Sequence, residues 1–297
     1  VGFVCAAVWG NFRALGVAVV VSLLASVLGT VFGAPIPLRA HLGVWPAALS
    51  FLACLVWMGH SKSTTGKLER SLAIAAFVLV CLQATLGGLR VTRETAGAVD
   101  VATVLRIVHG CVAQAFLVTL VALSVRISLI QKSANREEYV TSHAAKPWVW
   151  CALFVAYGQL ILGATMRHLG AGLAIPTFPS ANPEGGWMPK VHNLYTDLNF
   201  THTRFGALVV MLTVGIAVWK TWFSSASHSL LRKAALRSGV LVFIQASLGV
   251  LVVLHQKPKT LATIHVVLGA ALLASLVALL VHLLNASIQK SGVLHER

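Results

Sequence analysis

Residues 105–123 read "LRIVHGCVAQAFLVTLVAL", and residues 261–279 read "LATIHVVLGAALLASLVAL". Each stretch is an almost uninterrupted apolar run, and about twenty such residues are what an α-helix needs to cross the core of a bilayer. Each also holds one histidine near its start, His109 in the first and His265 in the second. Because a polar side chain inside a membrane helix is costly, it usually faces the bundle interior or a functional site. The two stretches therefore predict two membrane helices that present a histidine at a similar depth.

The composition of the whole chain is that of a membrane protein. Of its 297 residues, 57% are hydrophobic and only 10% are charged, with a mean hydropathy of +0.83, whereas soluble domains carry about 25% charged residues. Continuous apolar runs, in contrast to alternating ones, indicate helices whose backbone groups are paired internally. We therefore expect an all-α integral membrane protein, and we interpret the first run as a spanning helix rather than a cleavable signal. The eight predicted transmembrane helices lie near residues 12–33, 40–59, 70–89, 104–127, 147–166, 203–223, 234–254 and 261–284.

The net charge of +15 would suit a nucleic-acid-binding protein, but its distribution favours another origin. Lysine and arginine are more numerous in the loops on one side of the predicted membrane, as the positive-inside rule describes. This pattern predicts a multi-pass protein of the inner (cytoplasmic) membrane with both termini in the cytoplasm. The expected partner is the lipid bilayer and not a nucleic acid, and the oligomeric state is left open.

The chain divides into two similar halves. Its most polar stretch, "SLIQKSANREEYVTSHAAK" (128–146), separates four predicted helices from four more, which gives an N-terminal half (1–130), a cytoplasmic linker (131–146) and a C-terminal half (147–297). The third run contains "LVCLQATLGGL" (79–89) and the seventh contains "LVFIQASLGVL" (241–251). Gln83 thus corresponds to Gln245, and Gly87 to Gly249. We predict two pseudo-symmetric four-helix bundles related by duplication.

Four histidines follow this repeat. Each stands near the start of an even-numbered predicted helix, so all four are expected at one depth near the outer leaflet: His41, His109, His202 and His265. Two imidazoles that face each other across a helix bundle can supply both axial ligands of a haem iron. The alternative for any one of them is a hydrogen bond to a carbonyl or a position at the membrane interface. Four histidines in register favour the haem ligands, one pair in each half.

Three arginines lie close to these histidines on the same side of the membrane: Arg39, Arg106 and Arg204. Because a guanidinium matches a carboxylate in geometry, we expect the arginines to bind haem propionates. The alternative is that their side chains reach the lipid headgroups.

The chain resembles the haem A synthase family. The resemblance is carried by "LQATLGGLRVT" (82–92), "LGATMRHLGAGLAIPTFP" (162–179), "NFTHTRFGALVV" (199–210) and "LATIHVVLGAALL" (261–273). Members of that family are eight-helix membrane oxidoreductases that oxidise a methyl group of haem O to the formyl group of haem A. The resemblance implies that His202 and His265 hold a haem b that relays electrons, while His41 and His109 hold the haem being oxidised. It also implies haem O synthase or terminal oxidase assembly factors as partners.

The first half departs from the family pattern at one position. The family's second helix opens with a Glu-x-x-His unit whose glutamate is regarded as catalytic, and here Leu38 stands at the place of that acid. Glu94 and Asp100, in the outer loop before His109, are candidate catalytic substitutes. Alternatively, the protein is a non-catalytic dihaem b-type electron-transfer or assembly subunit of a respiratory complex. The long outer loop at 167–201 is expected to form a lid, or else a simple connection.

Overall fold

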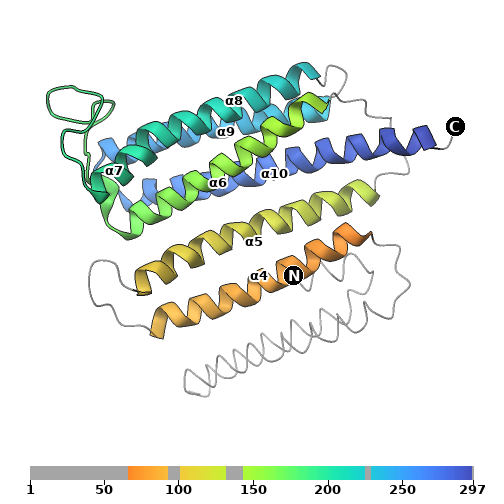
Figure 1. The fold of residues 1–297 in the computed structure, drawn as a ribbon, viewed down its shortest axis with the longest axis horizontal. Coiled ribbons are helices and arrows are strands. Elements are labelled where there is room, and N and C mark those ends of the chain that lie inside the picture. Colours follow the sequence, from red (N-terminus) through yellow and green to blue (C-terminus); the bar gives the residue numbers. More distant parts are fainter. Residues whose placement is uncertain (1–65, 93–100, 132–142, 225–228, 296–297) are drawn as a thin grey trace. The chain divides into compact units, whose positions relative to one another are not determined.

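The computed structural model describes residues 66–92, 101–131, 143–224 and 229–295, and every regular element in these ranges is a helix (Figure 1). Some predictions fall on other parts of the chain. Outside the described residues lie the predicted spans 12–33 and 40–59 and the residues Leu38, Arg39, His41, Glu94 and Asp100.

Six stretches of the described chain are long and apolar enough to cross a membrane. The long helices are α4 (Lys67–Thr92), α5 (Val101–Gln131), α6 (Lys146–His168), α8 (Ala207–Ser224), α9 (Ser229–Leu254) and α10 (Lys259–His295). One span is composite, because α8 continues without a break from the short helix α7 (Leu194–Phe200) and a π-helical turn, η4 (Thr201–Gly206). These helices confirm an all-α, multi-pass membrane protein. The total of eight helices and the pseudo-symmetry of two bundles stay predictions.

The contacts of the chain divide it into two compact units, Val1–Phe77 and Val78–Arg297. In the first unit the described residues are the beginning of α4, where Ser71 Oγ donates to the carbonyl of Lys67 at 3.0 Å. The second unit holds the rest of α4 and all later helices. The predicted division near residues 130 and 146 stays a prediction.

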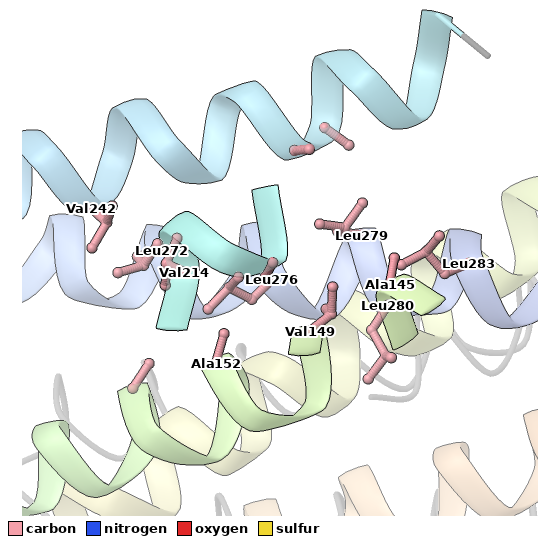
Figure 2. Packing of buried hydrophobic residues seen from close by; sticks show 14 of the residues in the cluster. Ala145, Val149, Ala152, Val214, Val242, Leu272, Leu276, Leu279, Leu280 and Leu283 are labelled. Carbon is pink, nitrogen blue, oxygen red and sulfur yellow. The ribbon is translucent and has the colours of Figure 1, made fainter. Parts of the chain in front are cut away.

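In the second unit α10 is the central helix. It contacts α9, α5 and α6, and 50% of its most apolar window is buried, against at most 22% in the other spans. Figure 2 shows its buried row of leucines, which includes Leu272, Leu276, Leu279 and Leu283. Small residues such as Ala152 of α6 and Ala217 of α8 belong to the same core. Small residues let membrane helices approach closely, which is how such helices associate where lipid removes the hydrophobic driving force.

Two hydrogen bonds attach α5 to the helices that follow it. The Tyr157 hydroxyl of α6 donates to the carbonyl of Cys111 at 2.9 Å, and Arg126 Nη1 donates to Asn285 Oδ1 of α10 at 3.1 Å. Cys111 is two residues from His109. The position of α5, and with it the position of His109, is therefore fixed by α6 and α10.

Candidate functional site

The imidazole of His109 on α5 packs against one face of α4. Its Nε2 atom is 3.3 Å from the amide nitrogen of Gln83, and a Cβ atom placed on Gly87 would lie 3.3 Å from its Cε1 atom. Gln83 and Gly87 are four residues apart and therefore share one face of α4. The imidazole edge thus meets a carboxamide on one side and bare glycine backbone on the other.

His265 of α10 makes the same contacts with α9. Its Nε2 atom is 3.4 Å from the amide nitrogen of Gln245, and a Cβ atom on Gly249 would lie 3.2 Å from its Cε1 atom. The sequence repeat aligned these glutamines and glycines with one another, but it did not predict that they contact the histidines. Equivalent residues of the two halves therefore meet through the same atoms.

His202 has a third site of this type, on α6. A Cβ atom on Gly163 would lie only 2.6 Å from the Cε1 atom of His202, and four residues earlier Gln159 Nε2 donates to the His202 carbonyl oxygen at 2.6 Å. Sequence reasoning missed both residues, although the signal was present. The pattern Gln-x-x-Leu-Gly occurs at 83–87 ("QATLG"), 159–163 ("QLILG") and 245–249 ("QASLG"). We call each Gln–Gly pair, with the histidine it contacts, a histidine seat.

The three seats share unsatisfied polar atoms. In the described part of the chain, the Nδ1 atoms of His109, His202 and His265 are buried without a hydrogen-bond partner. The side-chain oxygens of the three seat glutamines are buried without a partner as well. Buried polar atoms normally find partners, so a cluster of exceptions calls for an explanation such as a bound group.

The structure brings His202 and His265 together, because their imidazoles are close enough to interact electrostatically. The predicted partner of the His109 imidazole is His41, which lies outside the described residues. The pairing of His41 with His109 therefore stays a prediction.

His202 sits inside the π-helical turn η4, whose sequence is "THTRFG". A π-helical turn is rare and is found frequently at functional sites. The Gln159 side chain supports this turn from α6, because its amide nitrogen donates to the His202 carbonyl and its Oε1 atom occupies the place where a Cβ atom on Gly206 would lie.

Arg204 holds the loop between α6 and α7 in place through hydrogen bonds. It is only 3% exposed, and its Nη2 atom donates to the carbonyl oxygens of Thr177 at 2.5 Å and Ser180 at 2.8 Å. Its guanidinium also lies 5.7 Å from the ring centre of Phe178. The neighbouring Asn199, fully buried, donates to the carbonyl of Ala171 at 2.9 Å. These bonds join the loop to the turn that carries His202.

Two of the three arginines expected at haem propionates have protein partners, and the third, Arg39, lies outside the described residues. Arg204 is engaged by the loop, and Arg106 Nη2 donates to Thr103 Oγ1 at 2.9 Å within α5. Propionate binding by Arg106 and Arg204 stays a prediction, and so does the lid function of the loop.

The donor set of the seats suits a haem. In the described ranges no three His, Cys, Asp or Glu side chains come together as a metal site, whereas a haem needs only one or two axial ligands because its porphyrin supplies the other four. Neutral imidazoles such as those of His109, His202 and His265 can provide such ligands. The residues present therefore fit this group.

Comparisons with known proteins identify the relatives of the chain. The family model described as cytochrome oxidase assembly protein matches residues 42–277. The chain is 29% identical to a haem A synthase of Symbiobacterium thermophilum over 211 residues, which are 69% of this chain and 64% of that protein. It is 26% identical to a haem A synthase of Rhodopseudomonas palustris over 254 residues, 82% of this chain and 67% of that protein. The chain thus spans about two thirds of the length of these relatives.

A third relative carries a different name. The chain is 32% identical to a protohaem IX farnesyltransferase of Halobacterium salinarum over 130 residues, which are 44% of this chain and 28% of that protein. The similar segment is therefore a minor part of a longer protein.

Proposed function

The chain belongs to the family of cytochrome oxidase assembly proteins, and from this membership and the histidine seats we propose that it is a haem A synthase-like membrane oxidoreductase. It oxidises a methyl group of haem O to a formyl group and relays electrons through a bound haem b. The haem A synthases among its relatives support this reaction. The observation that carries the proposal is the seat repeated around His109 and His265.

Each histidine pair has its own role in the proposal. His202 and His265 hold the haem b, and their mutual proximity supports this pairing. His109, with His41, holds the haem O that is the substrate. When bound, the iron supplies the redox chemistry, and the chain ligates it, orients the porphyrin and excludes water. Arg204 contributes by keeping the outer loop packed beside the turn that carries His202.

Glu94 and Asp100 are proposed to provide the acid that Leu38 replaces. Both stand shortly before His109 in the sequence. Glu94→Gln and Asp100→Asn are each expected to lower the production of haem A by the purified protein, measured by mass spectrometry of extracted haems. If both variants produce haem A at the normal rate, neither residue is the acid.

The location and the partners belong to the proposal as well. We place the protein in the inner (cytoplasmic) membrane with both termini in the cytoplasm, where haem O synthase or terminal oxidase assembly factors are its partners.

The test is to identify the haems that the purified protein carries. The reduced-minus-oxidised spectrum is recorded, and the extracted haems are identified by mass. Haem O or haem A alongside haem b is the expected result. If the protein carries no haem of any kind, the proposal is wrong. His202→Ala and His265→Ala should each remove the haem b signal, and survival of that signal with normal axial ligation would contradict the pairing.

The second candidate is a non-catalytic dihaem b-type electron-transfer or assembly subunit. Leu38 in place of the family's glutamate favours it. Haem b as the sole haem, with no conversion of added haem O, would select this alternative.

A further inference from the structure

Positive charge and aromatic rings gather where α8 ends and α9 begins, at the same end of the bundle as the last turns of α10 (Figure 1). We propose that this corner binds the headgroup of an anionic phospholipid, with Arg232 and Lys233 as the residues that contact its phosphate. Such a lipid site is separate from the haem chemistry proposed above and does not depend on it.

Arg232 is held in place by Trp222 of α8. Its Nε atom donates to the Trp222 carbonyl oxygen at 3.2 Å, and its guanidinium lies 5.0 Å from the ring centre of the same residue. That carbonyl is one of the last four of α8, which have no partner inside the helix. The two terminal nitrogens of the guanidinium have no hydrogen-bond partner in the described part of the chain. A guanidinium that is oriented in this way can donate two parallel hydrogen bonds to the oxygens of a phosphate.

No acidic side chain of the neighbouring helices balances the charge of this corner. Lys233, the next residue, is exposed and forms no ion pair among the described residues. The sequences of α8, α9 and α10 contain neither aspartate nor glutamate. In the described part of the second unit the acidic residues are Glu184 and Asp197, in the loop before α7 and in α7 itself, at the other end of the bundle (Figure 1). Because a zwitterionic lipid carries its own cation, the unbalanced charge favours an anionic lipid.

Beyond the two cations, α9 offers an apolar surface for acyl chains. Leu236, Val240 and Phe243 are all exposed, and they follow Lys233 at intervals of three or four residues, which places them on one face of the helix. From Arg232 to Phe243 the helix rises by about 16 Å, roughly half the thickness of the hydrocarbon core of a bilayer. The charged residues and the apolar row therefore match the headgroup and the chains of one lipid.

The aromatic residues of α8 place the corner at the depth of the headgroups. Trp219 and Phe223 are both exposed, and their ring centres lie 4.6 Å apart. Trp222, which contacts Arg232, is exposed as well. Tryptophan is enriched at the interface between membrane and water. With both termini in the cytoplasm, as proposed above, this end of the bundle lies in the cytoplasmic leaflet, where anionic lipids attract lysine and arginine.

The experiment titrates the purified protein in detergent with dioleoyl phosphatidylglycerol and measures the dissociation constant of the first bound lipid by native mass spectrometry. Dioleoyl phosphatidylcholine has the same chains and a zwitterionic headgroup, and we expect it to bind more weakly. Arg232→Gln and Lys233→Gln should each weaken phosphatidylglycerol binding by about 5-fold. Arg232→Lys keeps the charge but loses the planar fork and its stacking on Trp222, so its affinity should fall between those of the wild type and Arg232→Gln.

Lys220→Gln is the matched control. Lys220 is an exposed lysine near the same end of α8, but it stands two residues before Trp222 and so lies on another face of the helix. Its substitution removes the same charge and should leave phosphatidylglycerol binding unchanged. If Lys220→Gln weakens binding as much as Arg232→Gln does, the lipid responds only to the total charge and the proposed site is wrong.

Two other results would overturn the proposal. The first is an equal affinity of the wild type for the two lipids. The second is displacement of phosphatidylglycerol by an equal concentration of inorganic phosphate, which would show a site for a soluble anion. Circular dichroism and size-exclusion chromatography establish that each variant is folded.

Discussion

Gly163→Ala is the substitution for which the structure gives the sharpest expectation. The added Cβ atom would lie 2.6 Å from Cε1, 3.2 Å from Nε2 and 3.3 Å from Nδ1 of His202. Ordinary van der Waals contact begins at 3.4 Å, so the His202 ring would have to move away from the 2.6 Å position by about 0.8 Å. The backbone of His202 cannot follow freely, because its carbonyl accepts a hydrogen bond of 2.6 Å from Gln159.

The expected cost has a structural and a functional part. Overpacking of this kind lowers the free energy of unfolding by about 1–3 kcal/mol. A functional group must also stay within about 0.5 Å of its working position, and the retreat exceeds that limit. We therefore expect Gly163→Ala to lose the low-spin haem b spectrum and to unfold at a lower temperature in detergent.

The matched control for this substitution is Gly158→Ala. Gly158 lies on the same helix, and a Cβ atom added there would meet nothing within 4 Å. It should keep both the spectrum and the thermal stability of the wild type. A Gly163→Ala protein with unchanged haem content, spectrum and unfolding temperature would refute the contact between His202 and α6.

Three further substitutions, one of them with a control, test other contacts. Gly249→Ala should perturb the haem b spectrum less than Gly163→Ala, because its Cβ would lie 3.2 Å from the ring of His265. Its control is Gly239→Ala, whose Cβ would lie 3.5 Å from the nearest side chain and which should leave the spectrum unchanged. Equal spectra of the Gly249→Ala and Gly239→Ala proteins would argue against this seat. Arg204→Met takes the arginine donor away from the loop carbonyls of Thr177 and Pro179, at about 1–3 kcal/mol each, whereas the Ser180 carbonyl keeps its bond from Thr177 Oγ1. Limited proteolysis should therefore cut the loop between α6 and α7 faster than in the wild type. Tyr157→Phe removes one hydrogen bond between α6 and α5 and should lower the free energy of unfolding by about 0.5–1.5 kcal/mol; no change in thermal unfolding would show that this bond adds nothing.

The sequence points to the histidines because a polar residue in an apolar run is conspicuous, and their role as haem ligands stays a prediction. It also predicted which residues of the two halves correspond, since Gln83 and Gln245 stand in similar strings. It did not predict the seats, because periodicity places a residue on a helix face but does not say which side chain of another helix meets it. Gln159 was missed for a related reason, as only the third and seventh helices were compared at this motif.

The π-helical turn and the loop around Arg204 could not be read from the sequence for a different reason. A string such as "THTRFG" has no local signal for a π turn, and the His202 carbonyl in this turn is bound by Gln159 from another helix. Arg204 looked like a propionate ligand because an arginine beside a predicted haem ligand suggests a carboxylate. The hydrogen bonds that Arg204 donates to Thr177 and Ser180 depend on how the loop between α6 and α7 folds back. No rule of sequence spacing predicts the path of such a loop.

The seats connect helix packing to chemistry. In a bilayer, helices associate through small residues that allow close approach, and a glycine serves that purpose on each of α4, α6 and α9. The same glycine leaves the room that an imidazole edge fills, as the distances from the missing Cβ positions show. A larger residue at such a position would both separate the helices and displace the histidine. Helix spacing and ligand geometry are therefore set by one residue, and the glutamine one turn earlier adds the polar contact that gives the seat its direction.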